Sequence, residues 1–137
     1  MRRHWLAGVA LLCVFALGAG AQEMTERQVK AAPGRDNRVA VYTNILPDCT
    51  SGPLPAIRLM VPPVHGAVSV KRGTLKVTNF KQCLATEAPV LVALYRPVDD
   101  FRGIDEFELE IALPGGRKQH QHFRVNVSGG LGGGQGI

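Results

Sequence analysis

The sequence has little of what marks the most easily identified functional classes. Of its 137 residues only 6% are aromatic, and the three cysteines are too few for a disulfide-rich scaffold. No run reaches the roughly 18 consecutive apolar residues of a transmembrane helix. No glycine-rich phosphate loop precedes a helix pattern, and Ser51, Ser69 and Ser128 do not lie in the context of a nucleophilic serine. With 45% apolar residues the chain is too apolar to be disordered, so we expect one globular domain without catalytic residues.

The first 21 residues have the layout of a secretory signal peptide. Two arginines precede an apolar run at residues 6–17, and small residues follow it up to residue 21. The alternative is an anchoring helix, but residues 6–21 would make only about 24 Å of helix against roughly 30 Å of hydrocarbon. We therefore predict cleavage near Gln22, no membrane span in the mature protein, and a periplasmic or secreted location.

Basic residues outnumber acidic ones only slightly once this leader is removed. The full chain has 16 Lys and Arg and 11 Asp and Glu, and two of the arginines belong to the leader. The other basic residues are scattered over many segments, whereas nucleic-acid-binding surfaces gather basic side chains and interleave them with aromatic ones. The sequence thus predicts a solvated, mildly basic surface and no nucleic-acid partner.

Two cysteines, Cys49 and Cys83, belong to the predicted mature chain. In an oxidising compartment an isolated pair is expected to join as a disulfide. Closing this loop would stabilise the fold by about 3.5 to 4 kcal/mol in the chain-entropy model. A redox or metal-binding role is the alternative, but neither cysteine lies in a C-x-x-C pair, so we favour the structural bond.

The body of the chain is dominated by the two-residue period of β-strands. No segment of residues 38–127 has a 3.6-residue apolar stripe. The short β-rich runs are residues 39–45, 56–61, 67–70, 74–78, 90–95, 107–111 and 123–127. Turn residues, including Gly73 and residues 114–116, separate them. About seven strands in this length predict an all-β fold, an antiparallel β-sandwich of the immunoglobulin-like kind.

The two ends of the predicted mature chain have other compositions. Residues 22–37 are polar, contain Pro33 and Gly34 and have no sustained apolar period, so we expect a flexible N-terminal arm. Residues 128–137 have the sequence SGGLGGGQGI, which predicts a disordered glycine-rich tail. The predicted organisation is therefore a signal peptide (1–21), an arm (22–37), the sandwich (38–127) and the tail (128–137).

The last two predicted strands permit a prediction of their register. If residues 114–116 form the turn, only one parity keeps the apolar residues on one face, and it places Phe107 opposite Phe123. The same register fixes five further pairs: Leu109–Gln121, Ile111–Gln119, Glu106–Arg124, Glu108–His122 and Glu110–His120. Oppositely charged cross-strand pairs contribute about 0.2 to 1 kcal/mol each, so sheet pairing alone explains the charge pattern.

Two segments carry a resemblance to known proteins. One is Tyr95–Phe107, with sequence YRPVDDFRGIDEF, and the other is Pro63–Val68, with sequence PVHGAV. Together they resemble the bacterial immunoglobulin-like and cadherin-like modules, in which a Pro-x-His-Gly-x-Val hairpin precedes Tyr-x-Pro, an aromatic residue, Gly, Asp and Phe. The matched positions are Pro63, His65, Gly66, Val68, Tyr95, Pro97, Phe101, Gly103, Asp105 and Phe107.

The resemblance implies a β-sandwich and structural roles for these residues. Gly66 and Gly103 are expected at corners that need a positive φ or a close backbone approach. Tyr95 and Phe107 are expected between the sheets, and Asp105 is expected to accept backbone N–H groups in its turn. The family often occurs as tandem repeats in large adhesins, whereas this chain has a single copy and no calcium-ligating motifs at both ends.

A His-x-His pair is a candidate metal site. His120 and His122 lie on the same face of a predicted strand, with Glu108 and Glu110 opposite, and such a set can bind zinc or copper. The alternative, which we favour, makes the histidines solvated partners of the glutamates. Residues 99–105 contain three aspartates without the alternating oxygen ligands of an EF-hand, so turn capping is favoured over calcium binding.

These observations favour an exported, non-enzymatic immunoglobulin-like module with a binding or structural role. We expect its partner to be a protein or another component of the cell envelope, and we expect no cofactor. The alternative is a periplasmic metal-binding protein that uses the His-x-His strand for copper or zinc. A third hypothesis is a subunit or inhibitor of an enzyme, whose loops meet an active site elsewhere.

Overall fold

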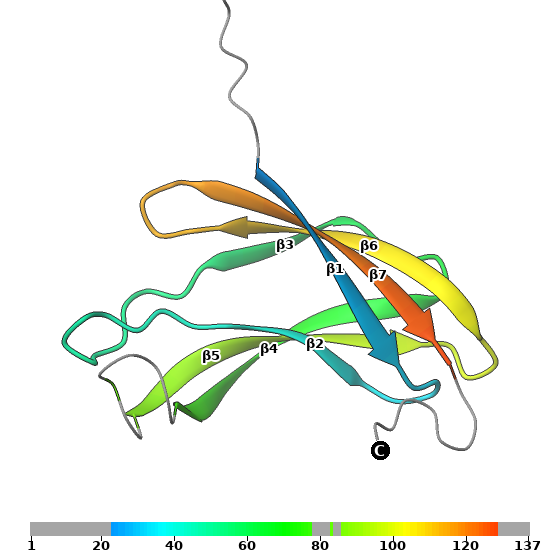
Figure 1. The fold of residues 1–137 in the computed structure, drawn as a ribbon, viewed down its shortest axis with the longest axis horizontal. Coiled ribbons are helices and arrows are strands. Elements are labelled where there is room, and N and C mark those ends of the chain that lie inside the picture. Colours follow the sequence, from blue (N-terminus) through cyan, green and yellow to red (C-terminus); the bar gives the residue numbers. More distant parts are fainter. Residues whose placement is uncertain (1–22, 78–82, 84–85, 129–137) are drawn as a thin grey trace, which may run out of the picture.

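Every element in the described part of the chain is a β-strand (Figure 1). The computed structural model describes residues 23–77, 83 and 86–128. Its strands are β1 (Glu23–Ala31), β2 (Asn37–Tyr42), β3 (Ala56–Val61), β4 (Gly66–Val77), β5 (Thr86–Pro97), β6 (Gly103–Ala112) and β7 (Lys118–Val127). The predicted all-β class is confirmed, and no helix in these ranges is long and apolar enough to cross a membrane. The predicted signal peptide (1–21) and the tail beyond Ser128 lie outside the described residues.

The strands form two facing layers, drawn one above the other in Figure 1. One sheet has the order β1-β7-β6-β3 and the other has the order β2-β5-β4. All neighbouring strands are antiparallel except β1 and β7, which run parallel. From β1 to β4 the chain alternates between the sheets, so each connection there crosses from one layer to the other. The fold is a two-sheet β-sandwich.

The core lies between the layers and is centred on stacked aromatic rings. The ring centroids of Tyr95 and Phe107 are 5.8 Å apart, and those of Phe107 and Phe123 are 4.7 Å apart. All three side chains are fully buried, and burial of a Phe side chain contributes about 1.5 to 3 kcal/mol. Aliphatic residues of both sheets surround the rings, among them Ala93, Leu109, Ile111, Val125 and Val127. The predicted placement of Tyr95 and Phe107 between the sheets is confirmed.

Strands β6 and β7 pair in the predicted register. Phe107 lies opposite Phe123, and the other five pairs are also those that the sequence predicted. The turn between the strands is closed by a bond of 2.7 Å from the Leu113 N–H to the Arg117 carbonyl. Gly115 and Gly116 have φ of 95° and 91°, a region that favours glycine. The glycine pair therefore fixes the turn, and the turn fixes the register.

The predicted flexible arm at residues 22–37 is wrong for most of its length. Residues 23–31 form β1, which pairs with β7 along its whole length. Only Ala31 of this strand is buried, because β1 lies at the edge of its sheet and its outer face is polar. An edge strand pairs through backbone hydrogen bonds and does not need apolar and polar side chains to alternate. The sequence of residues 23–31 therefore did not indicate a strand. The sandwich therefore begins at Glu23 and not at residue 38.

A second correction concerns β4. The sequence predicted two strands, residues 67–70 and 74–78, with a turn at Gly73, but β4 is one continuous strand beside β5. Gly73 pairs with Val90, and a Cβ added to it would lie 3.8 Å from the Val90 side chain, an ordinary contact. This glycine interrupts the alternation of side chains without ending the strand.

The first predicted run, residues 39–45, is only partly a strand. β2 ends at Tyr42, and its register against β5 shifts between Arg38 and Ala40, which is the pattern of a β-bulge. The bulge explains why the consecutive residues Val39 and Ala40 are both buried. A strict two-residue period does not predict that arrangement.

Candidate functional site

The buried carboxylate of Asp105 organises one end of the sandwich. Asp105 is only 3% exposed. Its Oδ1 accepts the backbone N–H groups of Val64 and Glu106, each at 3.0 Å. Its Oδ2 accepts the N–H of His65 at 3.0 Å and the hydroxyl of Tyr95 at 2.7 Å. We call this arrangement the Asp105 clamp, because it joins β6 to β5 in the other sheet and to the connection between β3 and β4.

The clamp also acts on the tyrosine. Burial raises the pKa of Tyr95 well above its ordinary value of 10.0, and the hydrogen bond to Asp105 and the charge of that carboxylate raise it further. The hydroxyl therefore stays protonated as a donor. The prediction that Asp105 accepts backbone N–H groups is confirmed, but two of its donors come from Val64 and His65 and not from its own turn. Local sequence could not reveal partners so far away along the chain.

The two glycines of the matched segments have the expected roles. A Cβ on Gly66 would lie 2.6 Å from the carbonyl oxygen of Arg96 and 2.7 Å from the ring of Tyr95, so only glycine permits this approach. Gly103 has φ of 130° at the start of β6, a conformation that side-chain-bearing residues rarely adopt. Both glycines therefore support the packing around the clamp.

The other matched residues gather at the same end. The ring of His65 stacks on Phe101 with centroids 4.0 Å apart, and the His65 carbonyl accepts the N–H of Val98 at 2.9 Å. Pro97 is fully buried, and Val68 packs against the core. Pro63 lies in the connection that the clamp holds. The two matched segments thus form a single structural unit.

A shallow hollow lies beside the Asp105 clamp. It has a volume of about 630 Å³ and lies between residues 61–65 and the outer face of β6 and β7. Its apolar rim is formed by Val61, Val64 and Ile104, which are 46%, 82% and 42% exposed. Its polar floor consists of Glu106, Glu108, His122 and Arg124. We call it the Val64 hollow.

The charges on the floor of the Val64 hollow are paired with one another. Arg124 Nη1 lies 3.1 Å from Glu106 Oε1, and His122 Nε2 lies 3.6 Å from the same oxygen. His122 Nδ1 lies 3.6 Å from Glu108 Oε1. Partly exposed pairs of this kind contribute about 0 to 1 kcal/mol to stability. Their main consequence here is that the floor is polar and that Glu106 and Arg124 neutralise each other.

The predicted metal ligands fall into two groups. His122 contacts Glu106 and Glu108, whereas His120 Nε2 lies 3.2 Å from Glu110 Oε2. Glu110 is also 3.7 Å from an Arg58 nitrogen. Within residues 23–77, 83 and 86–128, no three His, Cys, Asp or Glu side chains gather so as to hold a metal ion. The histidines are partners of the glutamates, as the sheet-pairing hypothesis predicts.

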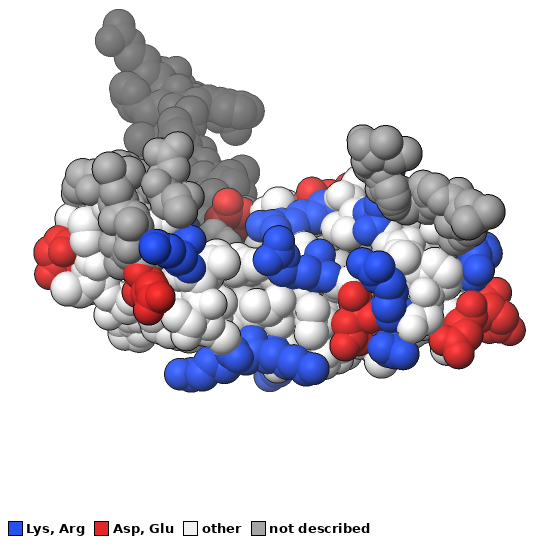
Figure 2. All heavy atoms as spheres, turned by 90° about the horizontal axis from the view of Figure 1, so that it is seen from below, with Lys and Arg blue, Asp and Glu red and all other residues white. Residues whose placement is uncertain are grey.

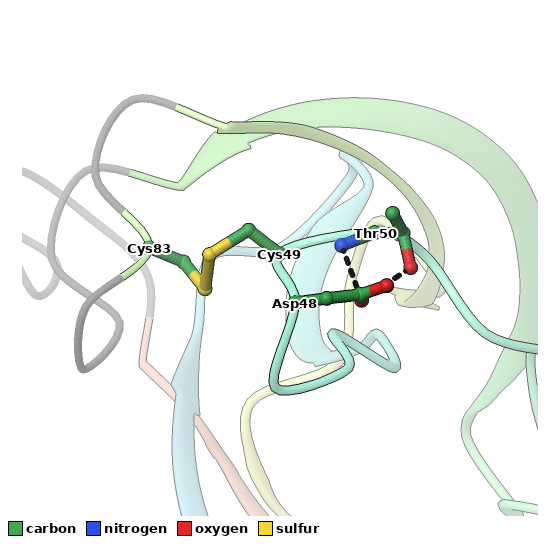
Figure 3. The surroundings of a disulfide bond; sticks show 4 residues. All are labelled: Asp48, Cys49, Thr50 and Cys83. Atoms are coloured by element: carbon green, nitrogen blue, oxygen red, sulfur yellow. Dashed lines mark hydrogen bonds between the residues drawn. A yellow bond between two sulfur atoms is a disulfide. The ribbon is translucent and has the colours of Figure 1, made fainter.

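The opposite end of the sandwich contains the predicted disulfide (Figure 3). Cys49 and Cys83 are bonded, with their Cα atoms 5.3 Å apart, and Cys83 is 2% exposed. Beside the bond, Asp48 accepts the hydroxyl of Thr50 at 2.6 Å and its N–H at 3.1 Å. These hydrogen bonds, first the one from the hydroxyl, lower the pKa of Asp48. The disulfide prediction is confirmed.

The two sheets differ in charge. The strands of the β2-β5-β4 sheet carry one acidic residue, Glu87, against five basic ones: Arg38, Lys71, Arg72, Lys76 and Arg96. Figure 2 looks at the molecule from the side of this sheet and shows groups of Lys and Arg atoms across it. Acidic residues instead concentrate on β1 and β6 of the other sheet. The Val64 hollow thus lies on the more acidic of the two sheets.

The apolar rim of the Val64 hollow was not among the residues predicted from the sequence. Val64 and Ile104 lie inside the matched segments, but neither is a matched position. One signal for it was available in the sequence. Val64 is an aliphatic residue between two predicted strands, and connecting segments run over the surface, so its side chain could be expected to be exposed.

These residues and their geometry are what the structure offers as a guide to function. A scan against protein-family models and searches of curated proteins and of solved structures find no match to this chain. The two-sheet sandwich, the Asp105 clamp, the disulfide and the Val64 hollow are therefore the observations from which a function is inferred.

Proposed function

We propose that the chain is an exported, non-enzymatic binding module with an immunoglobulin-like β-sandwich, which docks a partner protein of the periplasm or cell surface through the Val64 hollow. The two-sheet fold and the gathering of the matched segments at one end support the immunoglobulin-like assignment. The Cys49–Cys83 bond suits an oxidising compartment. The layout of residues 1–21 supports export.

The observation that carries the proposal is a highly exposed apolar side chain on a firmly held segment. Val64 is 82% exposed, yet its N–H and that of His65 are bonded to the buried Asp105 carboxylate. Grouped exposed apolar residues mark interaction sites, and Val61 and Ile104 complete the group. Because the clamp already fixes this segment, a partner would bind it without the entropic cost of ordering it.

The composition of the hollow fits a protein better than a small molecule. A small ligand needs a few unpaired polar groups that orient it. On the floor of the Val64 hollow, Glu106 is already paired with Arg124 and lies 3.6 Å from His122 Nε2. Protein interfaces combine an apolar centre with polar, charged surroundings, and this surface has that composition.

The pairing of the β7 histidines also argues against catalysis. A nucleophile is activated by a base within hydrogen-bond reach. His120 and His122 contact glutamates, and among the described residues neither contacts a hydroxyl or a thiol. Cys49 and Cys83 are joined to each other and are not available as nucleophiles.

Photo-crosslinking in cells that express the full chain tests this proposal. A benzophenone-bearing amino acid replaces Val64 in one variant and, as a control, the 41% exposed Leu75 of β4 in another. We expect a discrete crosslinked protein from position 64 and none from position 75. The substitution Ile104→Asp should lower the yield at least about fivefold, because docking would then bury a carboxylate. Leu75→Asp should leave the yield unchanged.

Two results would contradict the docking site. One is equal crosslinking from positions 64 and 75. The other is a crosslinked product from position 64 whose yield does not respond to Ile104→Asp, while thermal unfolding shows that this variant is folded. Either result would mean that the rim of the Val64 hollow is not what the partner contacts.

A further inference from the structure

A second hollow opens between the two sheets, toward the disulfide end. Its volume of about 460 Å³ lies within the range of small-molecule sites. Its polar lining consists of Arg27, Tyr42, Thr43, Asn44, Gln119 and Gln121. We call it the Tyr42 hollow. It shares no residue with the Val64 hollow and has no part in the docking function proposed above.

Arg27 is the unusual member of this lining. It pairs with the fully buried Phe123 in the β1–β7 ladder and therefore lies on the inner face of the sandwich. Its guanidinium carbon is 5.9 Å from the centre of the Phe123 ring. No Asp or Glu in the described part of the chain forms an ion pair with it. A half-buried guanidinium without a carboxylate partner is a ready site for an anion.

Two buried polar side chains lie beside Arg27. The hydroxyl of Tyr42 donates a hydrogen bond to Gln121 Oε1 across the two sheets, and these residues are 9% and 5% exposed. Burial raises the pKa of Tyr42 to about 12, against the opposing effect of the positive charge of Arg27. The hydroxyl is therefore uncharged at neutral pH. Its lone pairs and the Gln121 NH₂ group remain for a ligand, and Gln119 adds a second amide.

The lining limits the charge and the shape of the ligand. Among the described residues that line the hollow, Arg27 is the single cation and none is acidic. One guanidinium matches one carboxylate, whereas a doubly charged phosphate is normally met by several cations or backbone N–H groups. The lining also includes the apolar residues Pro55, Leu113 and Pro114, which suit the C–H face of a ring. The amides and hydroxyls suit a ligand that carries several hydroxyl groups.

We propose that the Tyr42 hollow binds a sugar acid, a ring with one carboxylate and several hydroxyl groups. The carboxylate pairs with Arg27, the hydroxyls bond to Gln119, Gln121 and Tyr42, and the C–H face packs on the apolar residues of the lining. The source of such a ligand is either a free uronic acid or the end of an acidic polysaccharide, and both present the same chemistry to the hollow.

Calorimetric and NMR titration of the full mature chain with glucuronate tests the proposal. Glucose, which has the hydroxyls without the charge, and acetate, which has the charge without the ring, should each bind at least about tenfold more weakly than glucuronate. The amide signals of Tyr42, Gln119 and Gln121 should shift, whereas those around Val64 should not. This mapping uses the unaltered protein and does not depend on whether a variant folds.

A matched pair of variants isolates the charge. Arg27→Gln should weaken glucuronate binding at least about tenfold, because it removes a charge-assisted hydrogen bond. Lys30→Gln removes the same charge from the exposed outer face of β1, and it should change the affinity less than about twofold. A uronate oligomer that binds more tightly than glucuronate identifies a polysaccharide end, and equal or weaker binding identifies the free sugar acid.

Three results would overturn the proposal. These are no glucuronate binding at millimolar concentration, acetate binding as tight as glucuronate binding, and equal losses of affinity in Arg27→Gln and Lys30→Gln. Shifts confined to amides outside the Tyr42 hollow would also overturn it, because the ligand would then bind elsewhere.

Discussion

The two ends of the sandwich are closed in different ways. At one end the buried carboxylate of Asp105 joins the sheets through hydrogen bonds to Tyr95 and to the backbone of Val64 and His65. At the other end the sheets flank a covalent bond between Cys49 and Cys83. The first end is held by buried hydrogen bonds. The second is held by a covalent bond, which does not depend on hydrogen bonding.

The inner face of β7 explains why the two closures differ. Toward the Asp105 clamp it presents the fully buried Phe123, Val125 and Val127, and toward the disulfide it presents Gln121 and Gln119. Apolar burial is therefore greatest near the clamp, where it shields the hydrogen bonds from water. Near the disulfide the inner face is polar and hollow, so a covalent bond contributes stability that packing there does not. The proposed ligand site occupies the polar half for the same reason.

The largest expected effect follows from removing the Asp105 clamp. Asp105→Ala removes four hydrogen bonds and leaves the buried Tyr95 hydroxyl without its acceptor. We expect a loss of about 4 kcal/mol in the free energy of unfolding, measured in urea. Asp99→Ala, at an exposed position of the same end, is the control and should cost less than about 0.5 kcal/mol. A loss below about 1 kcal/mol for Asp105→Ala would mean that the clamp does not close this end.

The second largest effect follows from removing the Cys49–Cys83 disulfide. Replacing both Cys49 and Cys83 by serine should cost about 3.5 to 4 kcal/mol, because the unfolded chain regains the entropy of an open loop. Reduction of the unaltered protein should give the same loss in urea unfolding. Crosslinking from position 64 should persist in the folded fraction, since the clamp lies at the other end. Loss of that crosslink would show that the two ends are coupled.

Alkaline pH sharpens the comparison, because each half contains one of the two tyrosines of the chain. The pKa of Tyr42 is raised to about 12 and that of Tyr95 is also raised, so the folded state binds protons that the unfolded state loses above its pKa of about 10. Stability is thus fully present below pH 10 and falls above it, by about 1.4 kcal/mol per pH unit for each tyrosine.

Urea unfolding at pH 9 and pH 11 measures this loss, which should reach about 2 to 3 kcal/mol. Tyr42→Phe and Tyr95→Phe should each halve the slope, one by removing the tyrosine of the hollow and the other by removing that of the clamp. A slope that is unchanged in either variant would show that its tyrosine ionises at an ordinary pKa.

The smallest effect concerns the floor of the Val64 hollow, beside the Asp105 clamp. Arg124→Gln removes the bond of 3.1 Å to Glu106, in which both side chains are 47% exposed. We expect a loss of less than about 1 kcal/mol, which disappears at high salt. A loss above about 2 kcal/mol would show that the floor of the Val64 hollow stabilises the fold, whereas we propose that it serves recognition.

Sequence patterns predicted the fold where the residues of two neighbouring strands determine their own pairing. The glycines of the 114–116 turn and the alternation around Phe107 and Phe123 fix both face and register, and the structure has the same pairs. They failed for β1, since an edge strand with one buried residue has no periodic signal. They also failed at Gly73, where a glycine, a residue typical of turns, lies within a continuous strand.

The site was less predictable than the fold, because it depends on contacts between distant segments. The resemblance indicated that Asp105 accepts backbone N–H groups, but the donors Val64 and His65 follow only from the way the two layers meet. The inward position of Arg27 likewise requires the parallel register of β1 on β7. Neither hollow is visible in the local sequence.

Amide hydrogen exchange at Val64 and His65, followed by NMR, tests most directly whether Asp105 holds the exposed connection in place. Both N–H groups lie on a surface segment, yet both are bonded to the buried carboxylate, so they should exchange at least about 100-fold more slowly than free peptide amides. Asp105→Ala, which removes both acceptor oxygens, should remove this protection, whereas reduction of the disulfide should leave it intact. Exchange of both amides at free-peptide rates in the unaltered protein would contradict the account.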